Sequence, residues 1–346
     1  MKSKINTAFW YLLFAVLLVL LFLANLWYGS VLIPWSKVLG VLSGSSAHDQ
    51  VAQVIVLEYR LPQAITALAT GIALGMSGLL LQTLFRNPLA GPSVLGISSG
   101  ASLGVALAVL FGTGLGVDLM VSVNPFSEVL LILSAMAGAL VVLLIILFVS
   151  NRVGNVVTVL IIGIMIGYAV SAIVGLLQFF SRAEELHAYI LWGLGSFSKT
   201  NQQQSVFLLI TSTAGVLLSV FLLKPMNALL LGENYARSCG INTKRVQTLV
   251  ILIAGFLVAI STAFTGPIAF VGLAVPHLAR SFYQTSNHRI LLPAVILMGG
   301  GLTLFCNLVA KLPGYDTSFP INAVTSVIGA PVVIWVIVKR GRMKKS

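Results

Sequence analysis

LGENYARSCGINTKR, residues 231–245, is a polar segment that lies between two long apolar runs, residues 206–223 and 246–264. Apolar runs of this length predict membrane-spanning helices, so the polar segment between them is expected to face water or a water-soluble partner. We interpret it as a docking surface for a motor protein. An ordinary solvated loop would have the same composition, and composition alone does not separate the two.

The composition indicates an integral membrane protein. Hydrophobic residues make up 58% of the 346 residues and charged residues only 8%, whereas about a quarter of an ordinary soluble domain is charged. The formal net charge of +12 does not indicate a nucleic-acid-binding protein, because the basic residues lie in short clusters between apolar runs. The two cysteines, Cys239 and Cys306, form no C-x-x-C pair, so neither a disulfide nor a metal site is expected.

About 20 apolar residues are needed to cross a bilayer as a helix, and about ten segments of the chain meet this need. They predict an all-α integral membrane protein with a single transmembrane domain over residues 1–346. The first span has no clear signal-peptide cleavage site, so we expect it to be retained. A further half-helix is expected within residues 189–197. The predicted spans are residues 8–28, 62–84, 93–111, 128–149, 156–180, 206–223, 246–266, a short segment 268–280, 291–310 and 321–338.

The basic residues predict the orientation in the membrane, because loops that stay in the cytoplasm are enriched in Lys and Arg. With the N-terminus inside, fifteen of the 20 Lys and Arg residues fall on the cytoplasmic side and five fall outside. Both termini are therefore predicted to be cytoplasmic, in the inner membrane, and segment 231–245 lies on the same side.

Glycines and prolines mark helices that pack closely or break. Small residues four apart let helices approach closely in lipid, and this spacing occurs at Gly71 and Gly75, at Gly96, Gly100 and Gly104, and at Gly163 and Gly167. Irregular backbone at membrane depth is tolerated only inside protein or along a cavity. Segments 93–111 and 268–280, which have prolines at their edges, are therefore candidate pathway helices. The candidate pathway residues are Gly96, Ser98, Ser99, Gly100, Gly266, Pro267 and Gly272.

The motifs of common enzymes and carriers are absent or out of context. Gly96-Ile97-Ser98-Ser99-Gly100 fits the G-x-S-x-G nucleophile pattern, but that motif needs a strand, a sharp turn and a histidine base. No H-E-x-x-H and no G-x-x-x-x-G-K-[ST] occurs, so neither a zinc protease nor ATP binding through a phosphate loop is expected. No Asp or Glu falls deep in a predicted span, which disfavours a carrier driven by an ion gradient.

Three blocks of sequence resemble the permease subunits of ABC importers for iron-siderophores, haem and cobalamin, the FecCD/BtuC type. The resemblance covers roughly residues 55–342. The first block comprises Arg60-Leu61-Pro62, Gly71, Gly78, Gln82 and residues 85–90 and 95–101; the second comprises Gly232-Glu233, Ala236-Arg237-Ser238, Gly240 and residues 266–268, 270–273, 275–277 and 279–280; the third comprises Val324-Thr325 and residues 328–331.

The resemblance implies a ten-helix subunit of the type II ABC importer architecture that pairs with a second copy of itself around a central pathway. Two ATP-binding cassette subunits would dock on the cytoplasmic side and a substrate-binding protein on the other. ATP and Mg would be bound by the ATPase subunits, and no cofactor by this chain. The coupling loop is expected at about residues 225–245, and the resemblance implies short coupling helices in the part that matches residues 231–245. The positions expected to contact the ATPase are Gly232, Glu233, Ala236, Arg237, Ser238 and Gly240.

The resemblance also implies a cytoplasmic gate and a docking surface for the binding protein. The gate would comprise Asn87 and Leu89 after the second helix, and Asn155, Val156 and Val157 before the fifth, where the two valines replace small hydroxyl residues. Arg60 and Lys311 match basic docking positions, Gln63 replaces a second arginine, and Asn322 stands where glycine is common.

The function expected from these observations is ATP-driven import of a metal chelate by a permease subunit that is not itself an enzyme. Iron-siderophore, haem and cobalamin are not distinguished, because a pathway lined by small apolar residues offers few side chains that recognise chemistry. The alternatives are a secondary transporter driven by an ion gradient and a membrane enzyme that uses Ser98 or Ser99.

Overall fold

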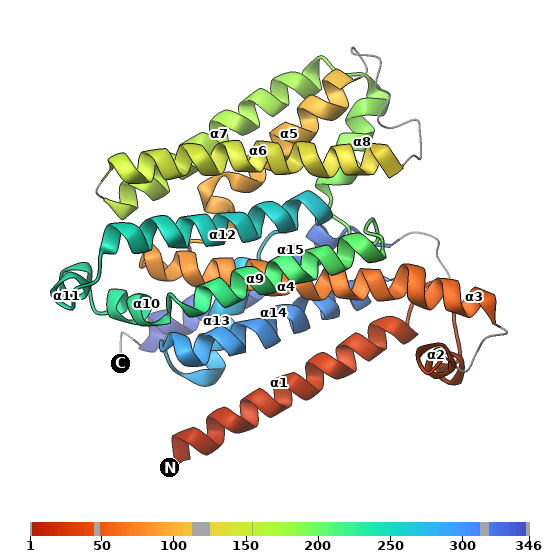
Figure 1. Ribbon diagram of the computed structural model, residues 1–346, viewed down its shortest axis with the longest axis horizontal. Coiled ribbons are helices and arrows are strands. Elements are labelled where there is room, and N and C mark those ends of the chain that lie inside the picture. Colours follow the sequence, from red (N-terminus) through yellow and green to blue (C-terminus); the bar gives the residue numbers. More distant parts are fainter. Residues whose placement is uncertain (1, 45–48, 113–124, 154, 312–317, 344–346) are drawn as a thin grey trace. The chain divides into compact units, whose positions relative to one another are not determined.

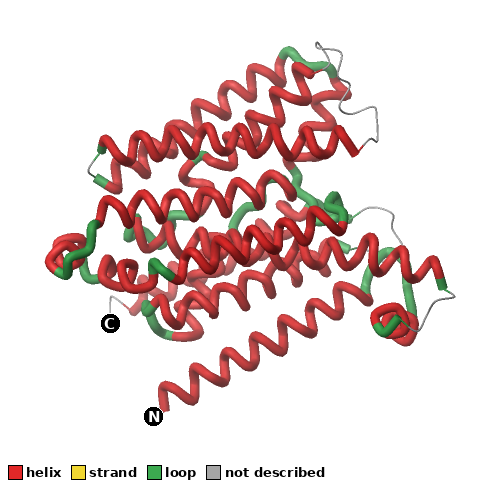
Figure 2. The backbone as a smooth tube through the Cα atoms, in the orientation of Figure 1, coloured by secondary structure: helices red, strands yellow, loops and turns green. Residues whose placement is uncertain are grey.

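The computed structural model describes residues 2–44, 49–112, 125–153, 155–311 and 318–343. Within these ranges all regular elements are helices, as Figures 1 and 2 show. The predicted all-helical fold is confirmed.

A helix occupies each of the ten predicted spans. Among the described residues, seven helices are long and apolar enough to cross a membrane, α5 and α15 contain shorter apolar helices, and α13 corresponds to the short predicted span. The helices that match the spans are α1 (Lys2–Trp27), α4 (Leu61–Leu84), α5 (Ile97–Gly112), α6 (Pro125–Arg152), α7 (Val156–Phe179), α9 (Gln202–Val220), α12 (Thr243–Thr265), α13 (Val271–Tyr283), α14 (His288–Ala310) and α15 (Ile321–Met343).

The second span begins earlier than the sequence indicates. The α-helix α3 (Gln50–Gln53) and the π-helix η1 (Val54–Arg60) lead directly into α4, so Glu58 and Arg60 lie in a helix and not in the predicted outer loop. Asp49 starts this helix, because its carboxylate accepts a hydrogen bond from the backbone N–H of Ala52 at 3.1 Å. The helix continues through Arg60 because carbonyl groups within the chain satisfy the guanidinium.

Further helices lie between the spans. The predicted half-helix at 189–197 is α8 (Ala183–Gly193), which begins earlier because the Glu185 carboxylate accepts a hydrogen bond from the backbone N–H of Arg182 at 3.1 Å. The third span opens with the 3₁₀ helix η2 (Pro92–Leu95), and Gly96 at φ +71° separates it from α5. The sequence did not predict α2 (Trp35–Leu42) or α10 (Leu223–Leu230) as helices. The short helix α11 (Glu233–Ser238) lies in the loop for which the resemblance implies coupling helices.

The chain forms two compact units. Unit 1 comprises Met1–Met76, Ser196–Ala214 and Ile268–Ser346, and unit 2 comprises Ser77–Gly195 and Gly215–Pro267. That both units act as the single permease domain expected over residues 1–346 stays a prediction.

In unit 1, α14 packs against α1, α13 and α15. The first half of α4 crosses α14 where two glycines meet: a β-carbon on Gly71 would lie 2.2 Å from the carbonyl oxygen of Gly299. Next to this crossing, the hydroxyl of Thr303 donates a hydrogen bond to the carbonyl oxygen of Ala67 at 2.7 Å. Glycine therefore permits a helix contact here that any side chain would block.

In unit 2, α5 packs against α6 most extensively and also against α7, α8 and α12 (Figure 1). A β-carbon on Gly104 would lie 1.9 Å from the carbonyl oxygen of Ser134, and one on Gly100 would lie 2.6 Å from that of Gly138. The prediction that glycines at helical spacing bring helices together is confirmed at both crossings.

Candidate functional site

The polar segment 231–245 forms a short helix, α11, and the turn that leads into α12. Gly232 at φ +125° and Gly240 at φ +77° bound α11, and a β-carbon on either residue would meet no atom within 4 Å. These glycines are therefore required by the left-handed backbone and not by lack of space. The segment for which the resemblance implies short coupling helices therefore contains a six-residue helix with sharply defined ends.

One face of α11 is anchored and the other is exposed. Ala236 is fully buried, and its carbonyl oxygen accepts a hydrogen bond from the N–H of Ile241 at 3.0 Å. On α11, Tyr235 is 50% exposed and Arg237 carries a charge to the surface, and Leu231, just before α11, is 68% exposed. Exposed apolar groups next to a charge on a rigid element are typical of a protein contact surface.

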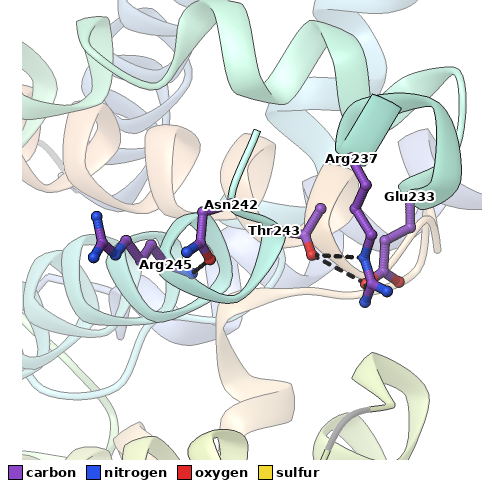
Figure 3. Close-up of polar contacts among 5 residues, drawn as sticks. All are labelled: Glu233, Arg237, Asn242, Thr243 and Arg245. Atoms are coloured by element: carbon purple, nitrogen blue, oxygen red, sulfur yellow. Dashed lines mark hydrogen bonds and ion pairs between the residues drawn. The ribbon is translucent and has the colours of Figure 1, made fainter. Parts of the chain in front are cut away.

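The charged residues of α11 face the start of α12. Glu233 and Arg237 form an ion pair of 2.7 Å, and the Glu233 carboxylate also accepts a hydrogen bond from the hydroxyl of Thr243 at 3.2 Å (Figure 3). The Nε–H of Arg237 donates to the same hydroxyl at 3.3 Å. Glu233 lies in the first turn of α11 and Arg237 in its last turn, where each charge complements the helix dipole.

A cavity of about 570 Å³ is lined by both the predicted gate turn and the predicted coupling segment, within unit 2. Its walls come from the end of α4, the start of α7, the end of α10 and the starts of α11 and α12. The lining residues are Leu84, Phe85, Arg86, Asn155, Val156, Val157, Leu229, Glu233, Thr243 and Gln247. Three of the predicted gate residues and one predicted coupling residue therefore share one cavity, although the sequence gives no sign that they meet.

The gate turns have defined local structure. Asn155 caps α7, because its side-chain oxygen accepts a hydrogen bond from the N–H of Val157 at 2.9 Å. In the other turn, the side-chain oxygen of Asn87 accepts from the N–H of Leu89 at 2.9 Å. Asn87 and Leu89 are not among the residues that line the cavity, but the neighbouring Arg86, at φ +46°, is. The gating role of both turns stays a prediction.

The predicted docking cations contact their own chain. Arg60 is 4% exposed and donates hydrogen bonds to the carbonyl oxygens of Leu26, at 3.0 Å, of Trp27 and of Val31. Lys311 is 8% exposed, and its amino group lies 2.9 Å from the carbonyl oxygen of Asn25. Both side chains therefore donate hydrogen bonds to carbonyl groups at the C-terminal end of α1 and just beyond it, which have no partners within the helix.

Gln63, the third predicted docking residue, donates a hydrogen bond from its side-chain amide to the hydroxyl of Ser198 at 2.7 Å. This exposed contact lies within unit 1. Contact between a binding protein and Arg60, Gln63 or Lys311 stays a prediction.

The candidate pathway residues of α5 contribute to helix packing. At Gly96 a β-carbon would lie 3.0 Å from the carbonyl oxygen of Gly163. The hydroxyl of Ser98 lies 3.4 Å from that of Thr262 in α12, and the helix containing Ser98 follows a 3₁₀ turn. A nucleophile elbow needs a strand at that place, so the structure does not support the serine-enzyme alternative.

The remaining pathway candidates lie around the start of α13. Gly266 ends α12 at φ +73°, and a β-carbon there would lie 2.5 Å from the carbonyl oxygen of Trp192. Pro267 follows it, and Gly272 is buried in the first turn of α13. Whether these residues or those of α5 line a transport pathway stays a prediction.

The structure gives Asn322 a role that the sequence did not. Its side-chain oxygen accepts a hydrogen bond from the N–H of Ala269 at 3.0 Å, in the turn before α13. Further along α15, Gly329 makes room for Phe270. A β-carbon added at position 329 would lie 2.5 Å from the β-carbon of Phe270. α15 therefore holds the turn that begins α13, within unit 1.

Sequence reasoning also missed Thr243 and Gln247, which line the cavity from the first two turns of α12. The sequence Asn242-Thr243 before an apolar run marks a helix start, but nothing local indicates what the Thr243 hydroxyl contacts.

The described residues contain no group of three or more His, Cys, Asp or Glu side chains that could hold a metal ion.

Comparisons with known proteins agree with this architecture. The sequence of residues 17–339 matches the FecCD transport family. The chain is 34% identical over 333 residues to the vitamin B12 import system permease protein BtuC of Escherichia coli O127:H6, which covers 96% of both chains. It is 35% identical over 290 residues to BtuC of Shigella sonnei, which covers 84% of this chain and 85% of that protein.

A solved structure described as an inward-facing conformation of a metal-chelate type ABC transporter superposes with a TM-score of 0.81 at 31% identity. The superposition covers 95% of this chain and 98% of the other. The family match, the sequence similarity over almost the full length and the shared fold agree with the helices and the segments described above. The chain therefore belongs to the FecCD transport family and is a permease of the ABC importer type.

Proposed function

We propose that this chain is the transmembrane subunit of an ATP-driven importer that moves cobalamin or a related metal chelate into the cytoplasm. The observation that carries the proposal is the 34% identity, over 96% of both chains, to a permease of a vitamin B12 import system. Iron-siderophore and haem are the other cargoes that the family resemblance implies.

The subunit works with partners. It pairs with a second copy of itself, two ATP-binding cassette subunits bind ATP and Mg²⁺ and dock on the cytoplasmic side, and a substrate-binding protein delivers cargo from the other side. The complex resides in the inner membrane with both termini of this chain in the cytoplasm. The excess of basic residues in the predicted cytoplasmic loops supports this orientation.

The arrangement of α11 supports its role as the contact with the ATPase. A short helix with a buried anchor, Ala236, presents Tyr235 and Arg237 to solvent, and Leu231 is exposed just before it. Closure of the two ATPase subunits on ATP displaces α11 as a rigid body. Because Glu233 of α11 and the gate turn 155–157 line one cavity, the gate turn has free space into which it moves when α11 and α12 shift.

The experiment is uptake into proteoliposomes that contain this chain and the ATPase of the same genome, with the cognate binding protein outside. Cyanocobalamin, a ferric siderophore and haem are each supplied in labelled form. We expect cyanocobalamin uptake that requires ATP inside the vesicles and is abolished by vanadate.

One result would contradict the proposal, and another would change only the cargo. Uptake that continues when the ATPase is omitted, and collapses when an ionophore dissipates the ion gradient, would establish the secondary-transporter alternative. Uptake of the siderophore or of haem in place of cyanocobalamin would retain the importer and change the cargo.

A further inference from the structure

Thr243 is the first residue of α12, and its hydroxyl contacts both charged residues of α11. The three side chains form a closed triangle, in which Glu233 and Arg237 are 2.7 Å apart and Thr243 lies 3.2 Å from the carboxylate and 3.3 Å from Nε of the guanidinium. Figure 3 shows Glu233 and Arg237 reaching from α11 toward Thr243, while Arg245 extends away. We call this group the α11–α12 latch.

The hydroxyl of Thr243 is not needed to start α12. The N-cap residue is Asn242, whose side-chain oxygen accepts a hydrogen bond from the N–H of Arg245 at 3.0 Å. Because the Asn242 side chain already caps α12 at the N–H of Arg245, the Thr243 hydroxyl is not required there as a second cap. The Thr243 side chain instead serves the contact with α11.

The latch differs from an ordinary surface ion pair. The side chains of Arg237 and Glu233 are 62% and 35% exposed, and a pair this exposed contributes little by itself. Thr243, by contrast, is only 9% exposed. The hydroxyl of this buried residue orients both charged groups relative to α12, which a freely solvated pair would not do.

The backbone supports the same connection. The N–H of Gly240 donates to the carbonyl oxygen of Arg237 at 2.9 Å, and that of Ile241 donates to Ala236 at 3.0 Å. These bonds hold the turn against α11, and the latch connects α11 to the first residue of α12 through side chains. α11 is therefore connected to the start of α12 by both the turn and the latch.

α12 extends the connection toward the predicted gate. Gln247, one turn after Thr243, donates a hydrogen bond to the hydroxyl of Ser150 in α6 at 3.0 Å. Thr243 and Gln247 both line the cavity that also holds the gate valines Val156 and Val157. The latch thus lies at the corner between the exposed helix and the gate cavity.

We propose that Thr243 is a positioning residue for coupling. Its hydroxyl holds Glu233 and Arg237 against the first turn of α12, so that displacement of α11 moves α12 and is not absorbed by the turn at residues 239–242. The role in coupling rests on the proposed function, whereas the rigid connection between the two helices does not.

The first test measures the connection itself. Thr243→Val keeps the shape of the side chain and removes the hydroxyl, and Thr243→Ser keeps the hydroxyl. Thr248→Val, in the same helix as Thr243, is the matched control. It removes a hydroxyl that lies 3.1 Å from the side-chain oxygen of Asn151 in α6 and 3.0 Å from the carbonyl oxygen of Lys244, and neither contact involves α11. Amide hydrogen exchange of residues 239–242 in the purified full-length chain is the readout.

We expect exchange in this turn to rise about fivefold in Thr243→Val, the factor that corresponds to roughly 1 kcal/mol for one hydrogen bond. Thr243→Ser and Thr248→Val should exchange there at the wild-type rate. An unchanged rate in Thr243→Val would overturn the latch whatever the cargo of the transporter is.

The second test measures coupling as the number of cyanocobalamin molecules imported per ATP hydrolysed in the reconstituted complex. We expect Thr243→Val to assemble and hydrolyse ATP as the wild type does but to import about fivefold less per ATP, with Thr243→Ser restoring the ratio. Wild-type complex that shows no ATP-driven uptake would overturn the proposed function and leave the exchange result standing.

A second variant tests the same contact in case Thr243→Val does not fold. Arg237→Lys retains the charge that pairs with Glu233 but lacks the Nε donor that reaches Thr243, and position 237 is exposed, so the chain should fold normally. We expect the same loss of coupling. A normal import ratio in both Thr243→Val and Arg237→Lys would refute the positioning role.

Discussion

At the scale of single residues, Lys311 is a predicted docking residue whose side chain is buried against its own chain. It directly follows the last residue of α14, and its amino group donates to the carbonyl oxygen of Asn25. Burial, and after it the charge of Arg60, lowers the pKa of Lys311 from 10.5 to about 7. The folded protein therefore holds an amine that is much less basic than an exposed lysine.

The lowered pKa makes stability depend on pH. Between about pH 7 and pH 10.5 the unfolded chain binds more protons at this position than the folded chain, so stability rises with pH in that window and is flat below it. One such group changes the free energy of unfolding by at most about 1.4 kcal/mol per pH unit. Lys311→Met keeps an apolar stem and removes the titrating group.

We expect the difference in thermal unfolding midpoint between wild type and Lys311→Met, measured in detergent, to shift in favour of the wild type as pH rises from 7 to 10. From pH 5 to 6 the difference should stay constant, which serves as the internal control. A difference that does not change between pH 7 and pH 10 would show that Lys311 titrates as an exposed lysine does.

At the scale of helices, close crossings at glycine organise both units. Gly104 of α5 faces the backbone of α6, where a β-carbon would lie 1.9 Å from the carbonyl oxygen of Ser134. A backbone atom cannot rotate away as a flexible side chain can. Gly175, in α7, has no such neighbour, since a β-carbon there would meet nothing within 4 Å.

We expect Gly104→Ala to destabilise the protein by about 1–3 kcal/mol, the usual cost of forcing an extra carbon into a packed contact. Gly175→Ala should be neutral or stabilising, because alanine favours a helix over glycine by about 0.5–1 kcal/mol. Thermal unfolding midpoints of the two purified variants give the measurement. Equal effects of the two substitutions would mean that the α5–α6 crossing adapts without cost.

At the scale of the whole molecule, the two cysteines report on orientation without any engineering. Cys239 lies at the end of α11 and is exposed, whereas Cys306 lies in α14 and is fully buried. A maleimide that cannot cross a membrane should therefore label one position of the native chain. The side from which it does so is the side that carries α11.

We expect labelling in inside-out membrane vesicles and little in right-side-out vesicles, because the proposed orientation puts α11 in the cytoplasm. Cys239→Ser should abolish the signal, and bound ATPase should reduce it by covering α11. Labelling of the intact chain from the outer side would contradict both the orientation and the coupling surface.

The sequence by itself determined the helical class, the ten apolar segments and the position of the polar segment 231–245. These features follow from hydropathy and from residues that end helices, such as Gly232 and Gly240. Both signals depend on only a few neighbouring residues. The family blocks added the positions of the gate and the docking residues as expectations. Helix extensions such as α3 and η1 were missed, because charged residues there resemble a loop until tertiary contacts satisfy them.

Only the tertiary structure decided what the polar side chains contact. Arg60 and Lys311 reach carbonyl groups near the end of α1, and Asn322 reaches a turn 53 residues away. The cavity combines three stretches of chain, and the latch depends on a turn that folds α12 back onto α11. Such contacts join residues through space, and hydropathy and helical periodicity record only which faces are apolar and not which partner each polar group meets.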